Sequence, residues 1–235
     1  MTDQLEKYGQ ITGSKKISDA IYGCFQFLNE SESEKFVRKF KKQPHDEGQV
    51  MHTFRELILG AYLAKYDFQM CHDYEIDSKT PDWSILDENS QPQCIYELLN
   101  FHPDAETSTD IIRQIEEKKD VWGYVVKPNT DRLYYKILEK ASKYKPIVLK
   151  HNLPYVIAVF GEFTAVVKEY EIDESLYGEI GLFEMYPEVS GLLYFEESTG
   201  SYLFRYKPNP HANISMEISS DWFHLKVVGP DPRST

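Results

Sequence analysis

The chain has 235 residues, of which 41% are hydrophobic; this is enough for one large α/β domain and argues against global disorder. Its formal net charge is −12. That charge argues against a free-standing, non-specific DNA-binding protein, because such proteins neutralise phosphates with an excess of basic residues. An acidic protein can still hold a local basic groove, so a nucleic-acid partner is not excluded.

Three cysteines, Cys24, Cys71 and Cys94, show neither CxxC spacing nor a zinc-binding pattern. Cys94 lies in the middle of a predicted strand, so we interpret it as a core residue rather than a nucleophile. Reduced thiols are typical of cytosolic proteins, and a cytoplasmic location is expected. No apolar run approaches about 18 residues, so no membrane span is expected, and the N-terminus does not resemble a signal peptide.

Hydrophobic periodicity predicts three helices near the N-terminus, at 16–28, 31–42 and 50–65. Ser31 and Glu34 form the pattern of a capping box at the start of the second helix. This helix contains a basic run at 35–42, interleaved with Phe36 and Phe40. The run could contact phosphates. We favour a helix that packs the two phenylalanines and leaves its charges in solvent.

The helix at 50–65 has the most regular apolar face, formed by Phe54, Leu57, Ile58, Ala61 and Tyr62. His52 and Glu56 are four residues apart and therefore share a neighbouring face. Glu56 is either a residue of a solvated helix face or a functional carboxylate. His52 is more often a residue of a helix start than a ligand.

Apolar patterns predict strands at 66–76, 82–87, 93–101 and 153–161. Between the last two, the sequence predicts a polar helix at 109–120 and a long helix at 131–150, which Pro146 should bend or split. A short helix at 173–181 and a β-hairpin at 190–206 follow, and the tail after Val228 is expected to fray. A meander followed by a crossover helix and a fourth strand predicts an α/β fold, with a mixed central sheet flanked by helices.

Two carboxylates stand at informative places in these strands. Asp82 follows Pro81 at the entrance to one strand, and Glu97 lies within the next. The meander can place both side by side at the end of the sheet, and Mg²⁺ prefers oxygen ligands. Glu97 is costly to bury in a central strand without a cation, a metal or a proton. For Asp82, an ordinary Thr-Pro-Asp turn is the structural alternative.

Pro81-Asp82, Glu97 and the helix residue Glu56, in this order of elements, resemble the PD-(D/E)XK nuclease superfamily. The resemblance covers residues 50–161 and implies a restriction-endonuclease-like core with the order α-β-β-β-α-β. Residues 1–49 would then be an N-terminal helical elaboration. Residues 162–235, with the hairpin, would be a C-terminal elaboration of the same domain.

The resemblance also implies roles for the three acidic residues. Asp82 and Glu97 would bind Mg²⁺ or Mn²⁺, and Glu56 would complete or support the metal shell from the helix. The metal would polarise the scissile phosphate and lower the pKa of an attacking water.

The chain departs from the superfamily's pattern at Leu99, where a lysine is usual. Leucine has neither a charge nor a hydrogen-bonding group. Either the lysine function has moved or hydrolysis is lost. The candidate replacements are Lys136 and Lys140, four residues apart on the predicted crossover helix, and Lys118, Lys119 or Gln114 on the preceding one.

Three functions therefore stay open at the level of sequence. The first is a metal-dependent nuclease-like protein that hydrolyses phosphodiester bonds with Glu56, Asp82, Glu97 and a relocated lysine. The second is a catalytically inactive module of the same fold that binds a nucleic-acid or protein partner. The third is an unrelated α/β protein in which the motif is accidental. The choice of DNA or RNA is open, and a homodimer would be consistent with cutting two strands.

Overall fold

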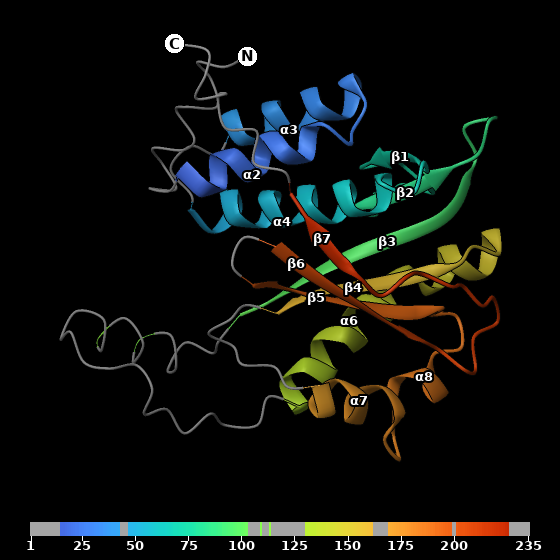
Figure 1. Ribbon diagram of the computed structural model, residues 1–235. Helices are drawn as coiled ribbons and strands as arrows, with labels where there is room; N and C mark the ends of the chain where they lie inside the picture. Colours follow the sequence, from blue (N-terminus) through green and yellow to red (C-terminus); the bar gives the residue numbers. More distant parts are fainter. Residues whose placement is uncertain are drawn as a thin grey trace, which may run out of the picture.

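The computed structural model describes residues 15–42, 47–102, 109, 113, 130–161, 169–198 and 201–225. The helices in these ranges are α2 (Lys15–Phe25), α3 (Glu30–Lys42), α4 (Glu47–Ala64), α6 (Thr130–His151), α7 (Glu169–Tyr177) and α8 (Leu182–Met185). The strands are β1 (Gln69–His72), β2 (Trp83–Leu86), β3 (Pro92–Phe101), β4 (Tyr155–Gly161), β5 (Gly191–Ser198), β6 (Ser201–Pro208) and β7 (Trp222–His224). Figure 1 shows their arrangement.

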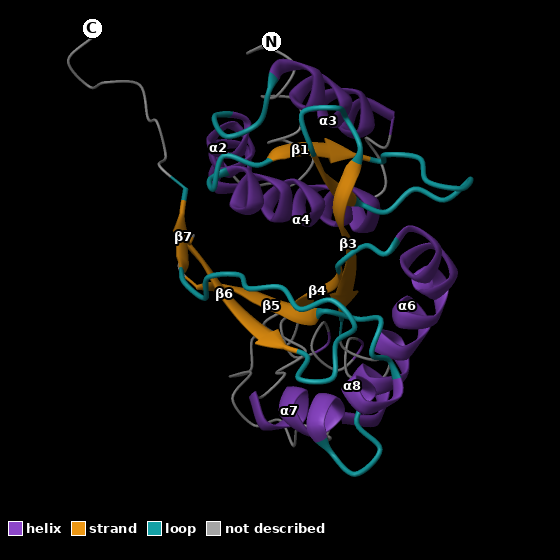
Figure 2. Cartoon of the chain, turned by 90° about the vertical axis from the view of Figure 1, so that its right-hand side faces the viewer, coloured by secondary structure: helices purple, strands orange, loops and turns teal. Residues whose placement is uncertain are grey.

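The strands form one seven-stranded sheet in which their spatial order follows their order in the chain. β1, β2 and β3 pair antiparallel, β3, β4 and β5 pair parallel, and β5, β6 and β7 pair antiparallel. The connection from β3 to β4 passes through α6, as a parallel pair requires. The predicted mixed sheet flanked by helices is confirmed, and Figure 2 shows that the sheet curls.

Helices cover both faces of the sheet, α2 to α4 on one face and α6 to α8 on the other (Figure 1). The alternation along β3 explains this arrangement, because successive side chains point to opposite faces. Tyr96 and Leu98 pack in the core on the α4 side, whereas Ile95 and Leu99 pack on the α6 side. Both faces of β3 are therefore buried, and polar residues within it need partners.

Gly60 of α4 allows this helix to lie close to β2. A Cβ atom at Gly60 would lie 1.9 Å from the ring of Trp83, so only glycine permits the contact. The indole Nε1 of Trp83 donates a hydrogen bond to the backbone oxygen of Glu56 (2.8 Å). This contact ties the middle of α4 to the strand that follows Asp82.

The structure differs from several sequence predictions. At the start of α3, Asn29 Oδ1 rather than the predicted cap Ser31 accepts a hydrogen bond from the backbone N–H of Glu32 (2.9 Å). The helix predicted at 173–181 is α7, at Glu169–Tyr177.

The strand predicted at 66–76 is shorter, because Asp67 before β1 and Asp73 after it have positive φ (61° and 53°). α6 runs unbroken through Pro146; the burial of its neighbours Tyr144, Ile147 and Val148 offsets the lost hydrogen bond. The edge strand β7 was not predicted.

Some predictions fall on residues outside the described ranges. Of the helix predicted at 109–120, the structure describes only Thr109 and Arg113, both helical, so Gln114, Lys118 and Lys119 are not placed. The tail after Val228 also lies outside them. The predicted hairpin is present as β5 and β6. None of the helices in the described part of the chain is both long and apolar enough to cross a membrane.

Candidate functional site

Asp82 and Glu97 lie opposite each other at the end of the β2–β3 ladder. Trp83 is paired with Tyr96 in this antiparallel register, so the next position places Asp82 across from Glu97. Opposite residues of an antiparallel pair project to the same face. The backbone N–H of Leu98 donates a hydrogen bond to Asp82 Oδ2 (2.6 Å), which holds this carboxyl against β3. The structure thus brings the two predicted metal ligands together.

Glu97 is almost completely buried, with 2% of its surface exposed. Its Oε1 atom accepts hydrogen bonds from two α6 side chains, Lys140 (2.8 Å) and Lys143 (2.7 Å). Its Oε2 atom is buried and has no hydrogen-bond partner among the described residues. One oxygen of this carboxylate is therefore doubly paired, and the other is available to a further donor or cation.

The surroundings of Asp82 are unfavourable for a charged carboxyl group. Burial and the negative charges of Glu97 and Glu56 raise the pKa of Asp82 to about 7, against the opposing effects of the Leu98 hydrogen bond and Lys140. Within the described part of the chain, no cationic side chain forms an ion pair with it. Near neutral pH, Asp82 therefore needs a proton or a cation.

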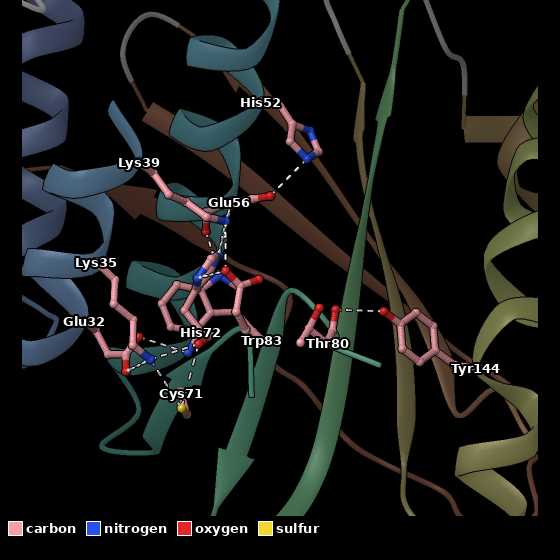
Figure 3. A network of polar contacts seen from close by, with 11 residues as sticks. Glu32, Lys35, Lys39, His52, Glu56, Cys71, His72, Thr80, Trp83 and Tyr144 are labelled. Carbon is pink, nitrogen blue, oxygen red and sulfur yellow. Dashed lines mark hydrogen bonds and ion pairs between the residues drawn. The ribbon is translucent and has the colours of Figure 1, made fainter. Parts of the chain in front are cut away.

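Glu56 is buried and fully engaged on the α4 side of the sheet (Figure 3). Its Oε1 atom lies 3.0 Å from His52 Nε2, and its Oε2 atom lies 3.0 Å from Lys39 Nζ and 3.2 Å from His72 Nε2. Burial alone would raise the pKa of Glu56, but the hydrogen bonds from His52 and His72 and the charge of Lys39 hold it well below its usual range. Both oxygens are occupied, so Glu56 acts here as a fixed negative charge near Asp82.

His72 links α3 to the end of β1 (Figure 3). Its fully buried ring packs between Phe36 and Trp83, with ring centroids 4.5 Å and 5.0 Å away. Its backbone N–H donates to Glu32 Oε2 (3.0 Å), and its backbone oxygen accepts from Lys35 Nζ (3.0 Å). The N-terminal helices are therefore joined to the sheet by a buried polar network as well as by apolar packing.

Asp73 extends this network beyond the end of β1. Its Oδ2 atom lies 3.1 Å from both Lys39 Nζ and His72 Nδ1; the second contact is an ion pair without hydrogen-bond alignment. Burial would lower the pKa of His72, but Asp73 and Glu56 raise it above its ordinary value. Lys39 and the His72 imidazole thus both contact the carboxylates of Glu56 and Asp73.

The residues of the basic run at 35–42 have two roles, apolar packing and ion pairing. Phe36 and Phe40 are fully buried, as the packing interpretation predicts. Lys35 and Lys39, however, turn inward to Glu32 and Glu56 rather than facing solvent. The spacing of Glu32, Lys35 and Lys39 on the face of Phe36 was a signal for this network, whereas the part of His72 depends on tertiary contacts.

Of the two lysines predicted on α6 to replace the missing one, Lys140 reaches Glu97. Lys136 instead pairs with Glu139 (3.6 Å) and is 55% exposed. Lys143, three residues after Lys140, also reaches Glu97 and was not predicted. Leu99 is buried in the apolar core on the α6 side, so it contributes only packing.

No three His, Cys, Asp or Glu side chains in the described ranges converge in a way that could hold a metal ion. Asp82 and Glu97 form a pair of carboxylates at most. Cys94 is buried, and burial raises the pKa of its thiol to about 12, in agreement with a core role.

Comparison of the chain with protein-family models, with curated proteins and with solved structures gave no match. The function of the site must therefore be judged from its geometry and charges.

Proposed function

We propose that this protein is a metal-dependent, nuclease-like hydrolase whose restriction-endonuclease-like core consists of α4, β1, β2, β3, α6 and β4. The order of these elements supports the proposal, as does their antiparallel, antiparallel, parallel strand pairing. The remaining elements would be elaborations around this core. The substrate would be a nucleic acid, and the ion Mg²⁺ or Mn²⁺.

The observation that carries the proposal is the pair of opposed carboxylates, Asp82 and Glu97. Asp82 has a raised pKa and no ion-pair partner among the described residues, and Glu97 has a buried oxygen without a partner. Both groups present hard oxygen donors, which suit Mg²⁺ or Mn²⁺. A divalent ion would supply the positive charge that Asp82 lacks and a partner for the second oxygen of Glu97, so the pair offers two of the oxygen ligands that such an ion needs.

The side chains around the pair have distinct parts in this proposal. Asp82 and Glu97 would hold the ion, which when bound polarises a phosphodiester and lowers the pKa of a water molecule. Lys140 and Lys143 provide positive charge beside the site, where Leu99 cannot. Such charges stabilise the phosphate as its negative charge grows. Glu56 would support the site through its charge.

The inactive binding module is the alternative, and two observations favour it. Lys140 and Lys143 already neutralise Glu97, and Leu99 is packed in an apolar core. In this alternative a proton on Asp82 takes the place of the ion. The protein would then bind a nucleic-acid or protein partner without cleaving it.

Titration calorimetry with MgCl₂ and MnCl₂ tests the proposal directly. We expect the wild-type protein to bind the ion and Asp82→Asn/Glu97→Gln to lose binding, because the double change removes both charged ligands. Glu188→Gln is the matched control, since Glu188 is also buried and paired with a lysine, Lys145 (2.6 Å). The absence of binding in a wild-type protein with a folded circular dichroism spectrum would contradict the metal site.

A cleavage assay with DNA and RNA then separates the enzyme from the module. We expect either single change, Asp82→Asn or Glu97→Gln, to slow cleavage by at least about 100-fold, equivalent to about 2.7 kcal/mol of barrier. A wild-type protein that binds nucleic acid but does not cleave it, with the same affinity in both variants, would favour the module.

A further inference from the structure

α6 concentrates basic residues in an otherwise acidic protein. The helix contains one arginine and five lysines, namely Arg132, Lys136, Lys140, Lys143, Lys145 and Lys150, against the acidic residues Asp131 and Glu139. The whole chain has a net charge of −12. A local excess of positive charge on such a background marks a surface that attracts anions.

Three of these lysines share one side of the helix. Lys136, Lys140 and Lys143 are spaced by four and three residues, which places them in a row along the axis. This row runs past Glu97, because Lys140 and Lys143 both contact that carboxylate. Lys136 and Lys143 are also well exposed, at 55% and 47%.

A fourth lysine, Lys79, joins the row from the connection between β1 and β2. Its ammonium group donates to the backbone oxygen of Lys143 and lies 5.8 Å from the ring of Tyr144. Lys143 Nζ lies 4.7 Å from the same ring. Tyr144 is fixed in turn by a hydrogen bond to the backbone oxygen of Thr80 (3.0 Å; Figure 3). In the described ranges Lys79 forms no ion pair, so no carboxylate there compensates its charge.

We infer that Lys79, Lys136, Lys140 and Lys143, here called the α6 lysine flank, bind the phosphate backbone of a nucleic acid and lead it to the Asp82–Glu97 pair. The inference rests on the proposed function for the class of polyanion. The four ammonium groups face the charges of Glu97 and Glu139, so the flank keeps a positive excess. The net negative charge of the chain would repel the same backbone, which favours binding on the side of the flank.

Fluorescence anisotropy with labelled single-stranded DNA, duplex DNA and RNA tests the flank. Binding is measured in EDTA over a range of KCl concentrations, so that cleavage does not interfere. Lys79→Gln/Lys136→Gln removes two charges without touching a contact of Glu97. Lys41→Gln/Lys42→Gln removes two exposed charges from α3 and is the matched control.

We expect the affinity of the wild type to fall as salt rises, because bound cations are released from the phosphates. The Lys79/Lys136 variant should show a smaller slope of log K against log salt, by about 0.7–0.9 for each phosphate that the protein no longer neutralises. The α3 control should keep the wild-type slope. Equal slopes in the two double variants, or a wild type that binds none of the probes, would overturn the inference. Equally tight binding of polyglutamate would overturn the assignment to nucleic acid.

Metal titration shows whether the inference about the flank and the proposed hydrolase function fail together or separately. Flank binding without a metal site would leave the inference standing and favour the binding module. Metal binding without binding of nucleic acid at the flank would contradict the inference but remain consistent with the proposed hydrolase function.

Discussion

At the scale of single residues, the net charge of the site depends on how the negative charges of three carboxylates are neutralised. Glu97 has two lysines, and Glu56 has Lys39 with two histidines. Asp82 lies within the electrostatic reach of both acidic residues and has a raised pKa. The negative charge that remains is therefore concentrated on one residue, and a cation or a proton would bind there first.

Asp82→Asn should raise stability more at pH 8 than at pH 4. Below about pH 4 the carboxyl of Asp82 is protonated in both the folded and the unfolded chain, so it has no effect. Between about pH 4 and its folded pKa of about 7, the unfolded chain releases the proton more readily, and stability falls as pH rises. The neutral asparagine avoids this loss, which we put at roughly 1–3 kcal/mol after solvent screening of a partly exposed group.

Urea denaturation at both pH values measures this difference. Asp67→Asn, at an exposed position, is the control and should show little pH-dependent gain. An equal gain in the free energy of unfolding of Asp82→Asn at pH 4 and at pH 8 would show that burial and the neighbouring charges do not disfavour the ionised carboxyl. Added Mg²⁺ should stabilise the wild type at pH 8 and leave Asp82→Asn unaffected.

At the scale of elements, α3 is joined to β1 and α4 through charged groups. Lys39 spans Glu56 and Asp73, and Lys35 binds Glu32 and the backbone of His72. Buried charges are tolerated only when they are paired, so removal of one partner costs more than the pair itself contributes. The N-terminal helices thus influence the charge of Glu56, which lies on the face of the sheet that they cover.

Lys39→Met should lower the free energy of unfolding by about 1–3 kcal/mol, because it leaves Glu56 buried with less compensation. The pKa of Glu56 is lowered in the folded protein, so its pairing stabilises the fold above about pH 4 and is lost as pH falls. The variant should therefore lose part of this pH dependence. Lys41→Met, at an exposed position of the same helix, should change stability by less than about 0.5 kcal/mol. Equal stabilities of the two variants in urea would refute the role of Lys39.

At the scale of the whole molecule, one sheet unites the predicted core with its elaborations. All seven residues of β4 are buried, and this strand pairs with β3 on one side and β5 on the other. The residues Ile21, Cys24, Phe36 and Phe40 of α2 and α3 are fully buried in the core that also contains α4. The parts that surround residues 50–161 therefore cover apolar surface that the core cannot cover alone.

We expect a fragment of residues 50–161 to lack a cooperative thermal transition, because it would expose β4 as an edge strand and uncover the apolar face of α4. Circular dichroism melting and size-exclusion chromatography, with the full chain as control, measure this. A fragment that melts cooperatively as a monomer would show that the core is an independent domain.

The sequence by itself determined most elements and the carboxylate pair, because these depend on local information. Side-chain periodicity predicts helices and strands, and the short connection between two adjacent strands can place Asp82 and Glu97 opposite each other. Only the tertiary structure decided which cationic side chains pair with the buried carboxylates. Lys140 and Lys143 rather than Lys136 reach Glu97, and Lys39 and His72 reach Glu56, because these contacts depend on how α6 and α3 lie against the sheet. The positions of α6 and α3 follow from the packing of apolar side chains that are far apart in the chain, and local sequence patterns do not predict such packing.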